Sequence, residues 1–125
     1  MVAGGNANAA TADFAVVGGG NDNQATAESS VVGGGSGNEA SGTYAFVGSG
    51  QHNFAQARFA TVGGGSANTA AADGTTIAGG IANVASADYS TVGGGVSNIA
   101  QNSCAVVGGG WRNNASDGFS AVCGG

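Results

Sequence analysis

The chain has 125 residues, of which 27 are glycine, none is proline and only 7% are charged, giving a formal net charge of −5. It contains no leucine and no lysine, which excludes a helical bundle, because bundles need long apolar side chains at their core positions. Arg58 and Arg112 are the only strong cations, so we expect no nucleic-acid partner. No apolar run approaches the ~20 residues of a membrane span, so we expect no membrane insertion by this segment.

The sequence repeats every fifteen residues without insertion or deletion. Eight complete repeats cover residues 2–121, and a partial ninth covers 122–125. A fixed period is typical of a solenoid, in which each repeat forms one rung that stacks on the rung before. We therefore expect residues 1–125 to form a single repeat domain. Because we find no polar cap at either end, we expect it to be a segment of a longer fibre.

We number positions 1 to 15 within each repeat, starting from Val2 in the first. In chain order, glycines at positions 2 to 4 predict a tight reversal, because glycine adopts positive φ without steric cost. Positions 7 to 9, residues 8–10 in the first repeat, predict a short strand. Positions 10 to 12 predict a second turn. Positions 13 to 15 with the next position 1, residues 14–17, alternate small and large side chains and predict a second strand.

Two strands per rung predict an all-β fold, a parallel two-sheet β-roll or β-solenoid with fifteen residues per rung and rungs about 4.8 Å apart. Position 7 is asparagine and position 9 is alanine in every complete repeat. We expect these columns and position 1 to point inward, with each asparagine amide bonding the equivalent amide one rung away. The predicted core ladder consists of Asn8, Asn23, Asn38, Asn53, Asn68, Asn83, Asn98 and Asn113 with Val17, Val32, Val47, Val62, Ile77, Val92 and Val107.

Positions 13 and 15 are then expected to point outward, and they carry large apolar side chains with no segment of this chain left to cover them. We therefore predict a homo-oligomer whose subunit interface contains this face; a monomer with an adhesive face is the alternative. Cys104, which occupies position 13, is expected to be a small buried hydrophobe there. The predicted interface consists of Phe14, Tyr44, Phe46, Phe59, Tyr89, Cys104 and Phe119.

Position 5 is polar in the first five repeats and apolar in the last three, where it holds Ile81, Val96 and Trp111. Together with Arg112 these residues are a candidate contact for a ligand or a neighbouring module. Ordinary packing across the oligomer is the alternative interpretation.

No motif points to catalysis, and we expect no enzyme, cofactor site or metal site. The glycine runs lack the lysine and helix of a phosphate-binding loop, and no nucleophile is tied to His52, the only histidine. Acidic pairs at position 12, such as Asp13 with Glu28, would be able to share a cation, but exposed acidic turns are commoner. Cys104 and Cys123 lie about 13 Å apart laterally, too far for an intrachain disulfide.

Repeats such as Tyr89-Ser90-Thr91-Val92-Gly93-Gly94-Gly95, followed by Asn98 and Ala100, resemble the head repeats of YadA-like trimeric autotransporter adhesins. The resemblance implies a left-handed, homotrimeric β-roll of an extracellular cell-surface adhesin that attaches to host-surface or extracellular-matrix molecules. Family repeats are usually a residue or so shorter, and the family's coiled-coil stalk and membrane anchor have no counterpart in this sequence.

Two alternatives remain at this point. A phage or virion fibre segment would use the same physical design, so the location is either an outer-membrane-attached fibre or a virion fibre. An ice-binding solenoid would need an unbroken threonine ladder on one face, whereas Thr61, Thr75, Thr76 and Thr91 occupy only three successive rungs.

Overall fold

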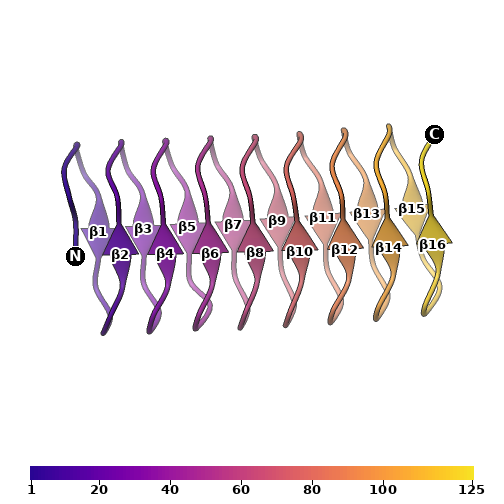
Figure 1. The fold of residues 1–125 in the computed structure, drawn as a ribbon, viewed down its shortest axis with the longest axis horizontal. Helices are drawn as coiled ribbons and strands as arrows, with labels where there is room; N and C mark the ends of the chain where they lie inside the picture. The colour runs from indigo at the N-terminus through magenta and orange to yellow at the C-terminus, as the bar shows by residue number, and fades with distance from the viewer.

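The computed structural model describes all residues 1–125 and is a straight stack of rungs with the two termini at opposite ends (Figure 1). Sixteen strands of two residues form two parallel eight-stranded sheets. The first sheet contains β1 (Ala9–Ala10), β3 (Gln24–Ala25), β5 (Glu39–Ala40), β7 (Phe54–Ala55), β9 (Thr69–Ala70), β11 (Val84–Ala85), β13 (Ile99–Ala100) and β15 (Asn114–Ala115). The second contains β2 (Val16–Val17), β4 (Val31–Val32), β6 (Phe46–Val47), β8 (Thr61–Val62), β10 (Thr76–Ile77), β12 (Thr91–Val92), β14 (Val106–Val107) and β16 (Ala121–Val122).

Every strand pairs with its equivalent in the next rung, so each residue faces the residue fifteen positions later. Val16 pairs with Val31 in the second sheet, and Ala10 pairs with Ala25 in the first. A third line of single bridges joins the position-5 residues from Asn6 to Trp111. The predicted parallel β-solenoid with fifteen residues per rung is therefore confirmed. The line of bridges at position 5 was not predicted.

The strands are shorter than the sequence predicts. The second strand was expected from position 13, but all residues there, such as Phe14 and Tyr44, have φ between +56° and +65° and lie in a turn. Position 6 has the same left-handed conformation in every rung. Both corners are held by backbone bonds to the preceding rung: the N–H of Phe59 donates to the carbonyl of Thr43 and that of His52 to the carbonyl of Ser36, both at 3.0 Å. The alternation of small and large side chains correctly predicted that position 13 points outward. The prediction that position 13 belongs to the strand was wrong.

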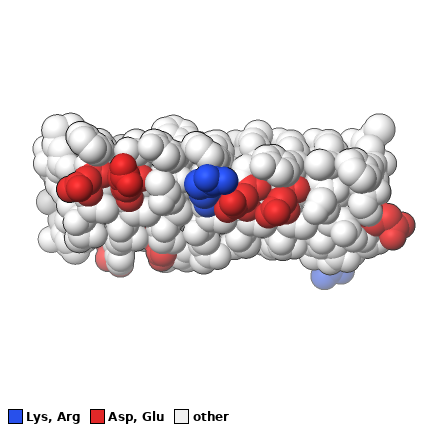
Figure 2. Space-filling model, turned by 90° about the horizontal axis from the view of Figure 1, so that it is seen from below, with Lys and Arg blue, Asp and Glu red and all other residues white.

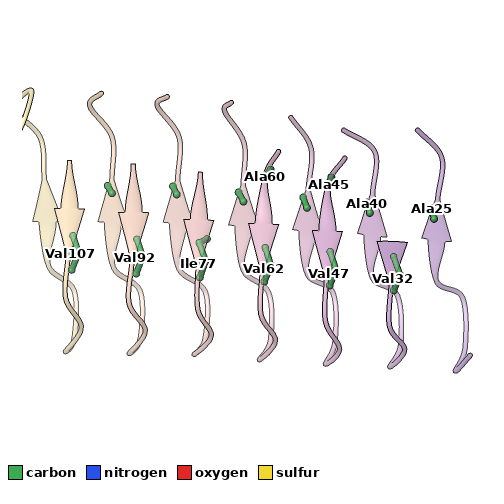
Figure 3. Close-up of a cluster of buried hydrophobic side chains, with 14 of the residues drawn as sticks. Ala25, Val32, Ala40, Ala45, Val47, Ala60, Val62, Ile77, Val92 and Val107 are labelled. Atoms are coloured by element: carbon green, nitrogen blue, oxygen red, sulfur yellow. The ribbon is translucent and has the colours of Figure 1, made fainter. Parts of the chain in front are cut away.

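The core is narrow and consists of three columns of small side chains, positions 1, 9 and 14, the last of which supplies Ala15, Ala45, Ala60 and Ala105. Position 1 supplies valine or isoleucine from the second sheet, and position 9 supplies alanine from the first (Figure 3). Val17 through Val107 in this column have no exposed surface. Because each rung has only two strands, the space between the two sheets is too narrow for a larger residue opposite the valine. This explains why alanine fills position 9 throughout.

The asparagines at position 7 form a hydrogen-bonded ladder inside the roll. In the middle of the stack, the amide Nδ2 of Asn68 donates to Asn53 Oδ1 at 3.0 Å and to the carbonyls of Gly64 at 3.0 Å and Gly80 at 2.9 Å. Its Oδ1 accepts the backbone N–H of Asn83 at 3.0 Å. Each amide thus joins its own glycine turn to both neighbouring rungs, so this buried polar group is fully paired.

The glycine of position 4 is required by the same arrangement. Gly65 has φ of +90°, and a methyl group built on it would overlap the carbonyl oxygen of Gly80 in the next rung. Gly109, at position 3, has open space around it. This difference explains why position 4 never varies while position 3 accepts Ser49.

Candidate functional site

A row of aromatic rings runs along the outside of the roll from the first rung to the eighth. Phe14 and Phe119 at its ends are 80% and 83% exposed, and Tyr89 is 65% exposed. Tyr44 and Phe59 lie in adjacent rungs with parallel rings whose centroids are 5.3 Å apart. All five rings belong to position 13, where the turn conformation turns them away from the core.

Position 15 forms the adjoining outer face of the second sheet. Its side chains alternate along each strand with the buried position 1, and they stack in register from Val16 to Ala121. Phe46 and Val106 are exposed, and the three threonines of β8, β10 and β12 are half-buried. We call positions 13 and 15 together the aromatic flank. Each residue of the predicted interface points outward on this flank.

Both cysteines are free and exposed. Cys104 was expected to be buried at an interface; in the single chain it is exposed because it occupies position 13 with the aromatic rings. Cys123 lies at position 2, in the glycine turn of the last rung.

Charged residues of position 12 border the aromatic flank in one row along the turn edge (Figure 2). The backbone N–H of Arg58 donates to the Asp73 carboxylate at 3.1 Å, and the guanidinium Nε lies 3.7 Å from Oδ2 of the same group. The Arg58 guanidinium also covers the ring of Phe59, 5.2 Å from its centroid. This pair was missed in the sequence, although opposite charges in one column of adjacent repeats were the signal that would have found it.

The candidate C-terminal patch of Ile81, Val96, Trp111 and Arg112 lies along the third line of bridges. Ile81 pairs with Val96 and Val96 with Trp111, so the three apolar side chains form a short ladder in consecutive rungs. They are 53%, 38% and 64% exposed. The Arg112 guanidinium lies over the Trp111 ring at 5.2 Å, which gives the patch a planar cation beside an aromatic face.

The other polar candidates do not come together. His52 is exposed at a position-6 corner, and its ring lies where a side chain on Gly37 would be. No group of three His, Cys, Asp or Glu side chains gathers at one point, and no pocket indents the surface. Nor does the chain contain a helix with the length and apolar character needed to cross a bilayer.

Comparison with models of known protein families finds no match, and comparison with curated proteins finds none either.

Proposed function

We propose that this chain is a structural segment of an extracellular adhesive fibre, and that its aromatic flank is covered by further copies of the same chain. The observation that carries the proposal is the row of five exposed rings in position 13 between Phe14 and Phe119, interrupted only by Ser29, Gly74 and Cys104, with Phe46 and Val106 beside it. Soluble proteins rarely expose a contiguous apolar surface of this extent unless it forms an interface. A stack in which every rung is hydrogen-bonded to the next also suits a rod with a mechanical role.

The resemblance to YadA-like head repeats supports the adhesive part of the proposal. It implies a left-handed roll, three parallel chains and a location on a cell surface, with attachment to host-surface or extracellular-matrix molecules. In a virion fibre the same rod would serve the same mechanical role. The C-terminal patch around Trp111 is the surface we assign to a ligand or a neighbouring module, because it is apolar, exposed and separate from the aromatic flank.

Light scattering tests the self-association directly. We expect a particle mass that is a multiple of the 11.6 kDa chain at micromolar concentration. A monomer at all concentrations would contradict the proposal, because the flank would then be bare in solution. Binding to immobilised collagen and to a glycan array tests attachment, with Trp111→Ser as the variant expected to lose it.

Ice binding is the second candidate, and one observation favours it. Thr61, Thr76 and Thr91 pair in register on the outer face of three neighbouring strands. Phe46 continues this column on one side and Val106 on the other, so the threonine face is only three rungs long. Absence of thermal hysteresis would exclude this function and leave the fibre proposal in place.

A further inference from the structure

We propose that the C-terminal patch binds a short acidic segment of a protein partner. Apolar side chains of the segment lie on Ile81 and Val96, and one of its carboxylates pairs with Arg112. The inference rests on the proposed function, which assigns this patch to a ligand or a neighbouring module, and it names the chemistry of that partner. It leaves the aromatic flank to self-association.

The apolar surface of the patch continues onto the outer face of the first sheet. Val84 in β11 and Ile99 in β13 pair in register, alternate with buried alanines and are half-buried. They follow Ile81 and Val96 by three residues in the same two rungs. Two apolar rows therefore run along this part of the rod, which indicates a partner that offers apolar side chains.

Polar side chains are few beside these rows. Position 6, which lies between them in sequence, carries Ala82 and Ser97 in the same rungs. The first rungs differ, because there the position-5 row begins with Asn6 and Asn21, whose amides are hydrogen-bonded to each other at 2.9 Å. A glycan presents hydroxyl groups, and burying hydroxyls against aliphatic side chains leaves them unpaired at a cost in free energy. The patch therefore suits a protein segment better than a glycan.

Arg112 is the strong cation that no acidic side chain neutralises. The one ion pair of the chain joins Arg58 to Asp73. Among positions 5 to 9, which form the side of the roll around Arg112, the nearest acid is Glu39 in the third rung, about 24 Å from the eighth. Asp117 belongs to the eighth rung but lies beyond β15, at the opposite turn. Charges more than about 8 Å apart are largely screened at physiological ionic strength, so the attraction at Arg112 is available to an anion of a partner.

The polar groups at this corner of the roll are hydrogen-bond donors. The Arg112 guanidinium lies over the Trp111 ring, 5.2 Å from its centroid. The side-chain hydrogen bonds around it all belong to Asn113, which leaves the guanidinium and the indole N–H free. A carboxylate only accepts hydrogen bonds and pairs with a planar guanidinium through two parallel bonds. Phosphate groups carry more charge and are typically bound by clusters of arginines, so a single arginine fits a carboxylate.

The area of the patch sets the size of the partner. Ile81, Val96 and Trp111 together expose on the order of 300 Å² of apolar surface. Each side of a stable interface between folded proteins buries about 800 Å². The three residues occupy consecutive rungs, and from first to last they span about 10 Å, the length of about three extended residues. A short segment therefore covers the patch, and several patches on one particle raise its low affinity through avidity.

Selection from a peptide library tests the chemistry of the partner without assuming a sequence. A phage-displayed library of random octapeptides is panned against the full chain, after phage that bind the Trp111→Ser variant have been removed. We expect the recovered peptides to combine aspartate or glutamate with aliphatic or aromatic residues. Recovery of peptides that lack an acid, or of no peptide at all, would overturn the inference.

Titration of a recovered peptide tests the contact with Arg112. The peptide is labelled with fluorescein, followed by anisotropy, and made in two forms, one with its acid and one with the corresponding amide. The wild-type chain should bind the acidic form about fivefold more tightly, whereas Arg112→Gln should bind both forms alike. Arg58→Gln is the matched control and should keep the preference, because Arg58 lies in the position-12 row at the opposite turn. If the preference survives in Arg112→Gln, the assigned contact is wrong.

Two further outcomes would also overturn the inference and leave the fibre proposal in place. Glycan-array binding that is lost in Trp111→Ser, with no peptide bound, would make the partner a glycan. Dissociation of the particle by Trp111→Ser, measured by light scattering, would make the patch a contact between subunits. A monomeric wild-type chain that still binds the acidic peptide would instead contradict the proposed self-association alone.

Discussion

The inside and the outside of the roll follow different rules. Along the interior, position 7 is asparagine and position 9 alanine in every complete rung, and position 1 departs from valine only at Ile77. On the aromatic flank, by contrast, position 13 changes from Phe14 to Ser29 to Tyr44 within three rungs. Position 13 nevertheless keeps one backbone conformation from rung to rung, as the interior positions keep theirs. The difference therefore comes from what each column contacts.

An interior column is fixed because each side chain must fit between identical neighbours above and below. The outer column meets no such restriction within one chain, so its side chains can differ from rung to rung and can match the surface of a partner. Interior changes should therefore lower the stability of a single chain, whereas changes on the flank should alter association.

The largest loss of stability is expected for Gly65→Ala. The new methyl group would overlap the Gly80 carbonyl, and φ of +90° is strained for any residue other than glycine. We expect the free energy of unfolding to fall by about 4 kcal/mol or more, measured by urea denaturation. Gly109→Ala is the matched control and should change it by less than about 0.5 kcal/mol, since open space surrounds that glycine. Equal effects of the two variants would show that position 4 is not constrained by stacking.

Asn68→Ala should have the next largest effect. It leaves the N–H of Asn83 and the carbonyl of Gly64 without a partner, whereas the carbonyl of Gly80 keeps the backbone N–H of Ser66. Leaving buried groups unpaired costs about 1 to 3 kcal/mol each, partly offset by relaxation, so we expect a loss of about 3 kcal/mol in unfolding experiments. Gln51→Ala, an exposed change in a neighbouring rung, should be close to neutral. If both variants unfold alike, the ladder contributes nothing beyond ordinary turn bonds.

Ile77→Val is a smaller interior change. Ile77 is the one isoleucine in a column of fully buried valines, so valine fits the same position in the neighbouring rungs. Removing one buried methylene should cost about 1 kcal/mol in the free energy of unfolding. A stabilising effect would indicate that the core is overpacked at this rung.

Tyr89→Ser should have the smallest effect on a single chain and a large one on association. The ring is 65% exposed, and serine already occupies position 13 at Ser29. We expect unfolding of the dissociated chain to change by less than about 1 kcal/mol, while light scattering shows a shift toward monomer. Trp111→Ser, on the other exposed apolar face, should leave the particle mass unchanged. If Trp111→Ser dissociates the particle and Tyr89→Ser does not, the interface lies on the face of Trp111 and not on the aromatic flank.

Much of the fold could be predicted because the same residue types recur at the same positions in eight repeats of one chain. The in-register stack, the inward columns and the outward direction of position 13 all follow from the period. The turns with positive φ at positions 6 and 13 could not be predicted from the period. Side chains alternate in the same way whether the backbone forms a strand or a turn. Gly37 and Gly74 were the available signals, since each places a glycine in a column that otherwise holds larger residues.

The candidate site was predicted less completely than the fold. The exposed rings were identified from their column, but the contact of Arg58 with Asp73 and Phe59 was not. It depends on how side chains lean between rungs, which periodicity does not specify. What covers the flank depends on a second molecule, and the properties of one chain supply only its shape, apolar area and order of charges.

Hydroxyl-radical footprinting of the assembled particle tests the central claim most directly, because it compares two exposed faces of the same molecule. The account predicts strong protection of Tyr44, Tyr89, Phe14 and Phe119 in the particle relative to the dissociated chain, with Trp111 modified equally in both. Equal modification of the aromatic flank before and after assembly would contradict it.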